Sequence, residues 1–497
     1  MQLGTILDTI DVLDLHGKLN VEISNITYDS RKALPESLYT CLPGTKTDGH
    51  LYIKNAIENG AIAILGSHEW YRQNANALNG DATFIGVKDT REAFAKLCAN
   101  FYNNPTKTLN LIGVTGTNGK TTTTHLIEQI LRELGYKSGL IGTLYYRYND
   151  ISLKAPHTTP QALELQKIFY DMLEAGITHV VMEVSSHALE QKRVAEFDYK
   201  VGVLTNITQD HLDYHGTMDN YRAAKLILFE KLLSSDSTAV LNADEPSTQS
   251  FLPYINSKVL TYGIQEKADI YADNIKANSN GTVFDVHSIY GCQTINLPLI
   301  GLFNVYNALS ALSSALAIGL PLEACCQILE RAPKVKGRME VITPIDFPFA
   351  AIVDYAHTPD GLINILKTAK QFTKNRLIIV FGCGGDRDKN KRPIMGQIAS
   401  EYGDVVIVTS DNPRTEEPMA IIDDILTGQE NKSNILIEED RRKAIFLAIN
   451  TAKEGDIVII AGKGHETYQI FKDKTIHFDD KEVIESALTE IVQNGKF

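Results

Sequence analysis

The chain has 497 residues, 43% of them hydrophobic and 22% charged, and its 61 acidic and 48 basic side chains give a formal charge of −13. At roughly 150 residues per domain, this length predicts about three domains, and the composition excludes a wholly disordered or fibrous chain. The acidic balance argues against a general nucleic-acid or anionic-membrane binder, because such surfaces need clustered cations. We therefore expect neither nucleic acid nor membrane as a partner.

Location is predicted from three sequence features. The six cysteines are scattered without CxxC spacing, which favours reduced thiols over disulfides or a zinc site. The opening residues, MQLGTILDTIDVLDLHG, lack the basic start of a secretory signal. No apolar run approaches the roughly 20 residues of a membrane-spanning helix, since the candidate at 308–320 is broken by serines and Gly319. A soluble, cytoplasmic protein is expected, and we expect a monomer.

Strand and loop patterns divide the chain into three predicted domains: 1–108, 109–336 and 337–497. The first ends in Asn-Asn-Pro-Thr after a helical stretch, which is typical of a linker. In the other two, apolar strands such as LNLIGVTG, THVVMEVSS, RLIIVFGCGG and DIVIIAGKGHE each end in a polar loop. Such strands, alternating with helices, predict parallel sheets covered on both faces. The predicted fold class is α/β, with a small N-terminal α/β domain, a central P-loop parallel-sheet ATPase domain and a C-terminal Rossmann-like domain.

The strongest local signal is the loop Gly116-Thr117-Asn118-Gly119-Lys120-Thr121, which follows an apolar strand and precedes a helical stretch. Glycines let backbone N–H groups surround phosphate oxygens, Lys120 adds a charge, and Thr121 offers a hydroxyl to Mg²⁺. The strict pattern has glycine at position 114, where this chain has Val114. The loop is therefore a variant P-loop, which disfavours generic NTPase and GTPase interpretations.

A phosphate loop needs a metal site, and two side chains at strand ends are candidates for it. Glu183 ends THVVMEVSS and His211 ends VLTNITQDH, so a carboxylate and an imidazole are expected at one sheet edge. Alone, His211 is more typical of a structural hydrogen-bonding residue. Likewise Lys225, in the amphipathic stretch NYRAAKLILFEKLL, is by itself typical of a solvated surface charge.

The last domain carries three polar loops at strand ends. In GCGGDRDKNKRP, Arg387 occupies the third glycine position of a dinucleotide fingerprint, so the basic loop better suits a carboxylate-bearing ligand; a solvated charged loop is the alternative. Asp411-Asn412-Pro413-Arg414 and Gly462-Lys463-Gly464-His465-Glu466 follow two further strands. An arginine and a glutamate on converging loops can clamp a zwitterion, although each loop alone is also an ordinary turn.

Together the motifs resemble the Mur ligases, ATP-dependent amide-forming enzymes of peptidoglycan precursor synthesis. The resemblance spans the chain in eleven ordered motifs: YDSRKA, TGTNGKTTT, HTTP, EVSSHAL, TNITQDHLDYHG, GLFNVYNALSA, VKGRME, VDYAHTPDGL, FGCGGDRD, DNPRTEEP and GKGHE. One departure is His157, where some relatives have asparagine before the Thr-Thr pair. The resemblance implies a UDP-sugar-binding domain, a central ATP-binding domain and a C-terminal amino-acid-binding domain.

The resemblance also implies roles for individual residues. ATP would be bound by Gly116, Thr117, Asn118, Gly119, Lys120, Thr121, Thr122, Asn304, Arg338, Asp354 and His357. The UDP-muramoyl-dipeptide would be bound by Ser30, Thr158, Thr159, Ser185, Gln191 and Arg193. The amino acid would be bound by Arg387, Asp411, Asn412, Pro413, Arg414, Gly462 and Glu466. Mg²⁺ would be held by Thr121, Glu183, His211 and Lys225, the last as a carbamate formed with CO₂. The catalytic residues would be Lys120, His211 and Lys225.

The implied reaction adds meso-2,6-diaminopimelate to UDP-N-acetylmuramoyl-L-alanyl-D-glutamate through an acyl phosphate, with ATP and Mg²⁺ as cofactors and closure of the C-terminal domain over ATP. Members that use diaminopimelate resemble this chain in carrying arginine at 414, and the second carboxylate of that substrate needs a cationic partner when buried. Three alternatives stay open: a lysine-adding Mur ligase, a folylpolyglutamate-type ligase, and a nucleotide-gated binding module that forms no bond. The first 108 residues argue against the second, because that family lacks a UDP-sugar domain.

Overall fold

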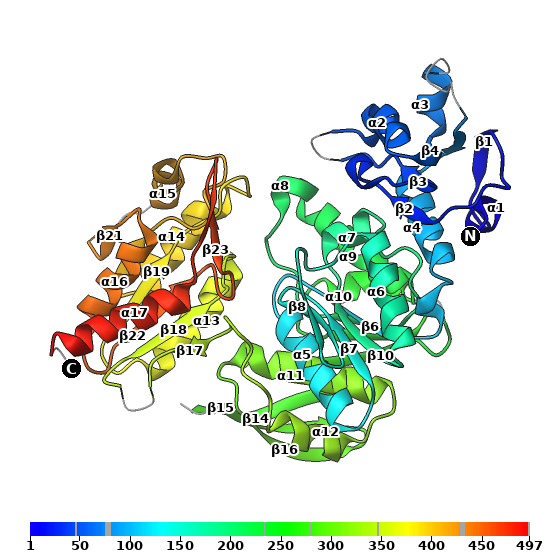
Figure 1. Ribbon diagram of the computed structural model, residues 1–497. Coiled ribbons are helices and arrows are strands. Elements are labelled where there is room, and N and C mark those ends of the chain that lie inside the picture. The colour runs from blue at the N-terminus through cyan, green and yellow to red at the C-terminus, as the bar shows by residue number, and fades with distance from the viewer. Residues whose placement is uncertain are drawn as a thin grey trace.

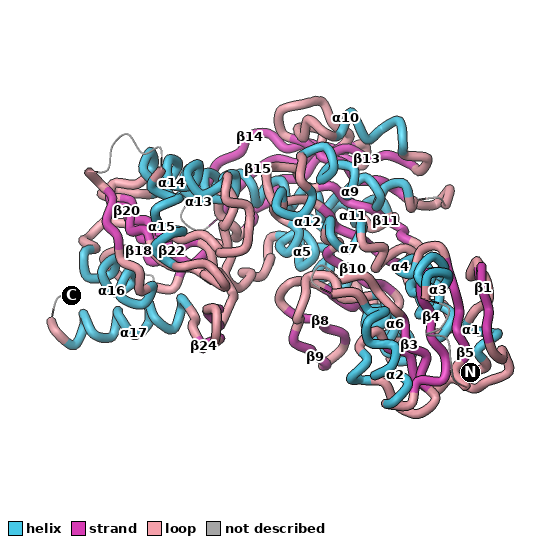
Figure 2. Tube along the Cα trace, turned by 90° about the horizontal axis from the view of Figure 1, so that it is seen from above, coloured by secondary structure: helices cyan, strands magenta, loops and turns pink. Residues whose placement is uncertain are grey.

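The computed structural model describes residues 1–44, 47–74, 81–232, 234–278, 281–344, 347–427 and 433–495. They form three bodies in chain order, and the N-terminal body (blue) and the C-terminal body (yellow to red) lie at opposite ends of the central one (Figure 1). The view from above shows the same separation (Figure 2). Each body is built on its own sheet, which confirms the three-domain α/β prediction. In the described part of the chain, no helix has the length and apolar character of a membrane span.

The N-terminal body contains a five-stranded sheet in the order β1-β5-β4-β3-β2. All neighbouring pairs are parallel except β1–β5. Its strands are β1 (Val12–His16), β2 (Asn25–Thr27), β3 (Ser37–Thr40), β4 (Ala61–Ser67) and β5 (Thr83–Val87). Its helices are α1 (Leu3–Ile6), α2 (Ile53–Glu58), α3 (His68–Gln73) and α4 (Thr90–Phe101). The last begins where the Asp89 carboxylate accepts from the first free backbone N–H groups.

The central body contains an eleven-stranded sheet in the order β16-β15-β14-β13-β12-β11-β6-β10-β7-β8-β9. Its strands are β6 (Asn110–Thr115), β7 (Ser138–Ile141), β8 (Tyr145–Tyr148), β9 (Ile151–Lys154), β10 (His179–Glu183), β11 (Tyr199–Leu204), β12 (Thr238–Asn242), β13 (Lys258–Gly263), β14 (Ile270–Asn278), β15 (Gly281–Ser288) and β16 (Gly291–Leu297). The middle strands, from β13 to β7, are parallel as predicted.

The sheet is not parallel throughout, because β8, β9, β15 and β16 join it antiparallel. The predicted parallel sheet is therefore the middle of a larger mixed sheet with antiparallel strands at both edges. Burial explains the difference: residues of β15 and β16 are buried largely in alternation, which is the pattern of antiparallel strands with one covered face. The parallel strands are buried almost throughout.

Helices cover both faces of the central sheet and form two separate hydrophobic cores. One core packs α5 (Lys120–Glu133), α11 (Leu302–Ala317) and α12 (Leu322–Leu329) against the sheet. The other packs α6 (Ala162–Glu174), α7 (Ser186–Glu190), α9 (Met218–Glu230) and α10 (Thr248–Phe251). The short α8 (Leu212–His215) precedes α9. The segment at 308–320 is thus largely a buried helix of a globular core.

The C-terminal body contains a six-stranded sheet in the order β17-β18-β22-β19-β20-β21 and a separate hairpin, β23–β24. The strands are β17 (Glu340–Val341), β18 (Ala350–Asp354), β19 (Leu377–Phe381), β20 (Val405–Val408), β21 (Ile435–Ile437), β22 (Ile457–Ala461), β23 (Tyr468–Ile470) and β24 (Thr475–His477). One face carries α13 (Pro359–Phe372), α14 (Lys391–Tyr402) and α15 (Pro418–Leu426), and the other carries α16 (Arg441–Thr451) and α17 (Asp480–Gln493).

The parallel strands β18 to β22 end at one edge, where the loops that follow them gather. The predicted domain limits after residues 108 and 336 stay predictions.

Candidate functional site

The P-loop connects β6 to α5, and two of its positions require glycine. Gly116 and Gly119 have φ of 148° and 86°, which disfavour any other residue. A Cβ atom on Gly116 would overlap Oγ1 of Thr205, and one on Gly119 would overlap Oδ1 of Asn307. The loop is therefore held tightly between the ends of neighbouring elements of the central body.

Two lysine side chains converge on this loop. Lys120 Nζ donates to the carbonyls of Gly116 and Thr117, both at 2.8 Å, and Lys225 Nζ donates to the same Gly116 carbonyl at 2.9 Å. Lys225 is only 1% exposed, so the interpretation of this residue as a surface charge was wrong. Burial lowers the pKa of both ammonium groups, and the charge of Lys120 lowers that of Lys225 further. One buried and one partly buried cation on the same loop favour an anion here.

Glu183 lies next to the start of α5. Its carboxylate accepts from Thr121 Oγ1 at 3.1 Å and from the backbone N–H and the hydroxyl of Thr143 at 2.8 and 3.0 Å. A carboxylate and a hydroxyl are hard oxygen donors, and Mg²⁺ typically takes one or two carboxylates together with substrate phosphates. The donor set fits that ion. Within the described ranges, no three His, Cys, Asp or Glu side chains form a metal cluster by themselves.

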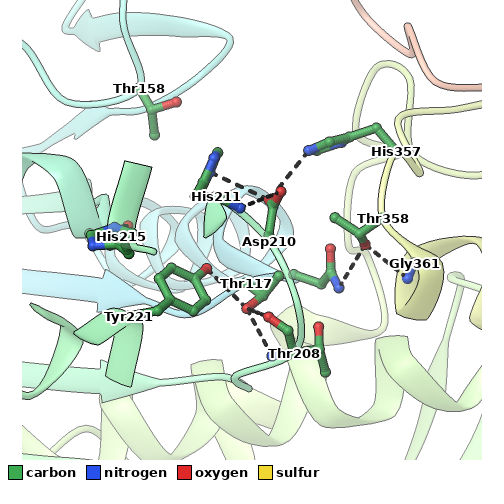
Figure 3. A network of polar contacts seen from close by, with 12 residues as sticks. Thr117, Thr158, Thr208, Asp210, His211, His215, Tyr221, His357, Thr358 and Gly361 are labelled. Carbon is green, nitrogen blue, oxygen red and sulfur yellow. Dashed lines mark hydrogen bonds and ion pairs between the residues drawn. The ribbon is translucent and has the colours of Figure 1, made fainter. Parts of the chain in front are cut away.

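Asp210 and His211 follow β11 and face the C-terminal body (Figure 3). The buried Asp210 carboxylate lies 3.4 Å from His211 Nε2, 3.6 Å from His357 Nε2 and 3.6 Å from Lys391 Nζ. Burial opposes its ionisation, but the contact with His357 and the nearby positive charges outweigh it and hold the pKa of Asp210 well below its usual value. Burial lowers the pKa of His211 to about 3, so its imidazole is neutral and free to bind a metal.

A cavity of about 310 Å³, here called the P-loop cavity, lies between the central and C-terminal bodies. Of the residues predicted to bind ATP, five contribute to its wall: Asn118, Gly119, Thr122, Arg338 and Asp354.

Asn304 lies behind this wall, where its Oδ1 accepts from Asn307 Nδ2 at 3.0 Å, and Asn307 itself reaches the cavity. Sequence reasoning missed Asn307, although its spacing of three residues from Asn304 puts both on one helix face.

A second space of about 580 Å³, the interdomain cavity, adjoins the first. The central body contributes Asp210 and His211, and the C-terminal body contributes most of the predicted amino-acid residues: Arg387, Asp411, Asn412, Arg414, Gly462 and Glu466. Pro413 is not part of the wall.

The segment 354–357 runs between the two cavities. Asp354 and Ala356 line the P-loop cavity, whereas Tyr355 and His357 line the interdomain cavity. His357 was predicted at the nucleotide and lies instead on this second side. One backbone stretch thus serves both sites.

The wall of the interdomain cavity carries the guanidinium groups of Arg387 and Arg414 and the carboxylates of Asp210, Asp411 and Glu466. Arg414 is half-buried, and burial together with the charge of Arg387 lowers its pKa. Asn412 Nδ2 donates to Glu466 Oε2 at 2.9 Å. Positive and negative groups in one cavity match a ligand that carries both charges.

The third space, the N-terminal cavity, has about 860 Å³ and lies between the N-terminal and central bodies. Ser30, Gln191 and Arg193 line it, and His157 lines both this cavity and the interdomain cavity.

Thr158 lines the interdomain cavity. Thr159 is buried, and its hydroxyl donates to the Glu183 carbonyl and accepts from Ser185 N–H. Ser185 caps α7 through the N–H of Ala188. These contacts tie the predicted acceptor residues to β10.

Comparison with known proteins gives matches along most of the chain. The Mur ligase middle domain matches residues 114–315, the glutamate ligase domain of Mur ligases matches 337–464, and the Mur ligase catalytic domain matches 22–102. The chain belongs to the Mur ligase family. A relative from Syntrophomonas wolfei, named UDP-N-acetylmuramoyl-L-alanyl-D-glutamate--2,6-diaminopimelate ligase, is 47% identical over 97% of both chains. One of the same name from Clostridium tetani is 45% identical over 99% of this chain and 100% of its own.

Solved structures agree with this Mur ligase assignment. A structure of a UDP-N-acetylmuramoyl-L-alanyl-D-glutamate--2,6-diaminopimelate ligase superposes with a TM-score of 0.68 at 33% identity and covers 99% of both chains. A folylpolyglutamate synthase from Mycobacterium tuberculosis shares the fold at 20% identity with a TM-score of 0.63, but covers 73% of this chain and 91% of its own.

Proposed function

We propose that this Mur ligase is an ATP-dependent amide ligase that joins the D-glutamyl γ-carboxylate of UDP-N-acetylmuramoyl-L-alanyl-D-glutamate to an amine of meso-2,6-diaminopimelate, in peptidoglycan precursor and cell-wall synthesis. The relatives named for this reaction support the substrate pair. The observation that carries the proposal is the shared wall at 354–357, which separates a cavity beside the P-loop from a cavity that carries Arg387, Arg414 and Glu466. A phosphorylated acid formed on one side can meet an amine held on the other.

In the first step, an oxygen of the γ-carboxylate attacks the γ-phosphorus of ATP, the new O–P bond forms, and ADP leaves. Lys120 would reduce the repulsion between the two anions and stabilise charge on the transferring group. In the second step, the free amine attacks the acyl carbon, and phosphate departs from the tetrahedral intermediate with the electrons of the broken C–O bond. The attacking nitrogen gives up one proton, which the departing phosphate accepts. Closing of the cavity around the acyl phosphate keeps water out.

Mg²⁺ would be held by Thr121, Glu183, His211 and Lys225, the last after carbamylation. Bound there, the ion supplies positive charge to the phosphate oxygens. The burial of Lys225 supports the modification, because a lowered pKa increases the share of neutral amine that reacts with CO₂. That reaction forms an N–C bond and releases one proton.

The proposal is tested by incubating the protein with ATP, the UDP-dipeptide and an equimolar mixture of diaminopimelate and lysine, with product masses read by mass spectrometry. We expect the diaminopimelate adduct. A lysine adduct in excess would favour the lysine-adding alternative.

Phosphate release is measured in parallel with each substrate omitted in turn. Release that needs both the UDP-dipeptide and the amino acid supports the ligase, whereas release from ATP alone favours a nucleotide-gated binding module. Amide formation on a folyl glutamate would favour the third alternative, although the family match over 22–102 argues against it.

A further inference from the structure

Lys463 lies in the loop after β22, between two glycines that turn the chain inward. Gly462 and Gly464 have φ of 114° and 54°. A Cβ on Gly462 would lie 2.7 Å from Asp411 Oδ2, and one on Gly464 would lie 2.6 Å from Tyr355 Cβ, so neither position has room for a side chain. Between them the Lys463 side chain is fully buried, at 0% exposure. Lysine is almost never fully buried unless it is paired.

The ammonium of Lys463 is paired with two residues of the amino-acid site. Its Nζ donates to Asn412 Oδ1 at 3.1 Å and to Glu466 Oε2 at 3.2 Å. The ring of Tyr468 lies 5.7 Å from the same atom. Lys463 therefore joins the loop after β20 to the loop after β22.

These contacts determine which way the Asn412 amide points. Its Oδ1 accepts from Lys463 and from the backbone N–H of Ile470 at 3.0 Å. Its Nδ2 is thereby turned toward Glu466 Oε2, to which it donates at 2.9 Å. If the Lys463 ammonium is removed, Asn412 Oδ1 keeps only one of its two hydrogen-bond donors. The orientation of the Asn412 amide is then held less firmly.

Lys463 acts from behind the cavity wall. Asn412 and Glu466 line the interdomain cavity, whereas Lys463 is not among the described residues of its wall. The carboxylates of Asp411 and Glu466 both belong to that wall. Burial opposes the ionisation of Asp411, and the charge of Lys463 is the strongest effect that lowers its pKa. A buried cation between two carboxylates offsets their mutual repulsion.

We propose that Lys463 is a positioning residue for the amino-acid substrate, which aims the Glu466 carboxylate at the substrate ammonium, both by its own hydrogen bond to Glu466 and through Asn412. The inference rests on the proposed function, because it takes the interdomain cavity to be the diaminopimelate site. It adds to that function a residue that sets amine affinity without touching the substrate.

The test is Lys463→Met, which retains most of the apolar stem and removes the charge. We expect KM for diaminopimelate to rise about tenfold or more, since hydrogen bonds to charged groups are the strong ones in such sites. KM for ATP and for the UDP-dipeptide should each stay within about twofold, because the P-loop and N-terminal cavities do not contain this contact. Lys370→Met is the matched control, as it breaks a lysine–carboxylate pair with Asp404 on the surface of the same body.

A second variant separates positioning from folding. Removing one partner of a buried pair destabilises a protein, so the double variant Lys463→Met/Glu466→Gln removes the leftover charge and should recover thermal stability relative to Lys463→Met. Its KM for diaminopimelate should stay as high as that of Glu466→Gln alone, because the two residues act on one contact.

Three outcomes overturn the inference: an unchanged KM for diaminopimelate in Lys463→Met, an equal rise in all three KM values, or a double variant whose KM recovers along with its stability. Each of these, with an active wild type, leaves the proposed function standing. A wild-type protein that forms no diaminopimelate adduct overturns the proposed function and this inference together.

Discussion

Arg414 has a left-handed backbone (φ 53°) at the wall of the interdomain cavity, and its guanidinium donates to the Gly385 carbonyl at 2.8 Å. That contact uses one end of the group and leaves further N–H donors for a carboxylate. The charge of Arg387 lies close enough to lower the pKa of Arg414. Two neighbouring cations are costly together unless an anion joins them, which suits the distal carboxylate of diaminopimelate.

Arg414→Ala should therefore lower kcat/KM for diaminopimelate by about 10–100-fold, because a hydrogen bond to a charged group contributes about 1.5–3 kcal/mol. Lysine lacks the distal carboxylate, so its slow reaction should change little. Competition assays with both amino acids measure the change. Arg442→Ala, on the surface of α16 over the Phe446 ring, is the control, and an undiminished preference for diaminopimelate would contradict the assignment.

His465 makes folding sensitive to acid. Burial, together with the charges of Arg338 and Lys336, lowers the pKa of His465 to about 3; the unfolded value is about 6.5. The unfolded chain then binds more protons between these values, so the free energy of unfolding falls as pH drops below 6.5. We expect His465 to account for about 2 kcal/mol of the loss between pH 7 and pH 5.

The measurement is denaturant unfolding at both pH values for wild type and His465→Phe, which preserves the ring 4.9 Å from Tyr355. The variant should lose less stability on acidification. His477→Phe is the control, because His477 is exposed and its pKa is raised by Glu482; it should not reduce the loss. An unchanged pH dependence in His465→Phe would show that this imidazole does not titrate as expected.

At the scale of elements, apolar runs that end in polar loops predicted strands such as β6, β10, β11, β19 and β22. Nearly every residue in these runs is buried, and a strand that is buried on both faces has an unbroken apolar sequence. Such a run can be recognised without knowing which elements pack against it. The antiparallel hairpins were missed because alternating strands depend on which neighbour covers one face. The burial of Lys225 could not be predicted for the same reason. Helix periodicity indicates which residues share a face of α9, but only the packing of α9 against the P-loop makes the face with Lys225 internal.

The loop between β6 and α5 allows a test of whether ATP binding requires glycine at position 116. Gly116→Ala would force a Cβ into Oγ1 of Thr205 at φ 148°, so the loop must shift. We expect ATP affinity to fall about 100-fold or to be lost completely, and stability to fall by about 1–3 kcal/mol, the usual cost of a strained backbone position. Isothermal titration with ATP and thermal unfolding measure the two effects.

Gly135→Ala is the matched control, because Gly135 follows α5 with φ 85° and a Cβ there meets nothing within 4 Å. It should cost about 1 kcal/mol of stability and leave ATP affinity unchanged. Wild-type ATP affinity in Gly116→Ala would contradict the assignment of this loop to the nucleotide.

At the scale of the molecule, the reaction needs the central and C-terminal bodies together, because the interdomain cavity takes residues from both. Polar pairs join them beside the cavity: Asp210 with Lys391 at 3.6 Å, Gln209 with Asp388 at 2.9 Å, and the P-loop residue Asn118 with Asp360 at 2.8 Å. Six of the seven residues that the sequence motifs predicted for the amino-acid site line this cavity, but no motif indicates pairs that form only when two folded bodies meet.

The Asp210–Lys391 pair should couple the two bodies during catalysis. We expect Asp210→Asn and Lys391→Gln each to lower kcat, and the double variant to be less impaired than the sum predicts, with a coupling energy of about 0.5–3 kcal/mol. Lys389→Gln is the control, because Lys389 pairs with Glu416 inside the C-terminal body and should be additive with Asp210→Asn. Fluorescence transfer between labels on the two bodies, measured with ATP bound, should report a lower closed fraction in both single variants. Additive losses in kcat with unchanged transfer would mean that Asp210 acts through His211 alone and that the C-terminal body closes without this pair.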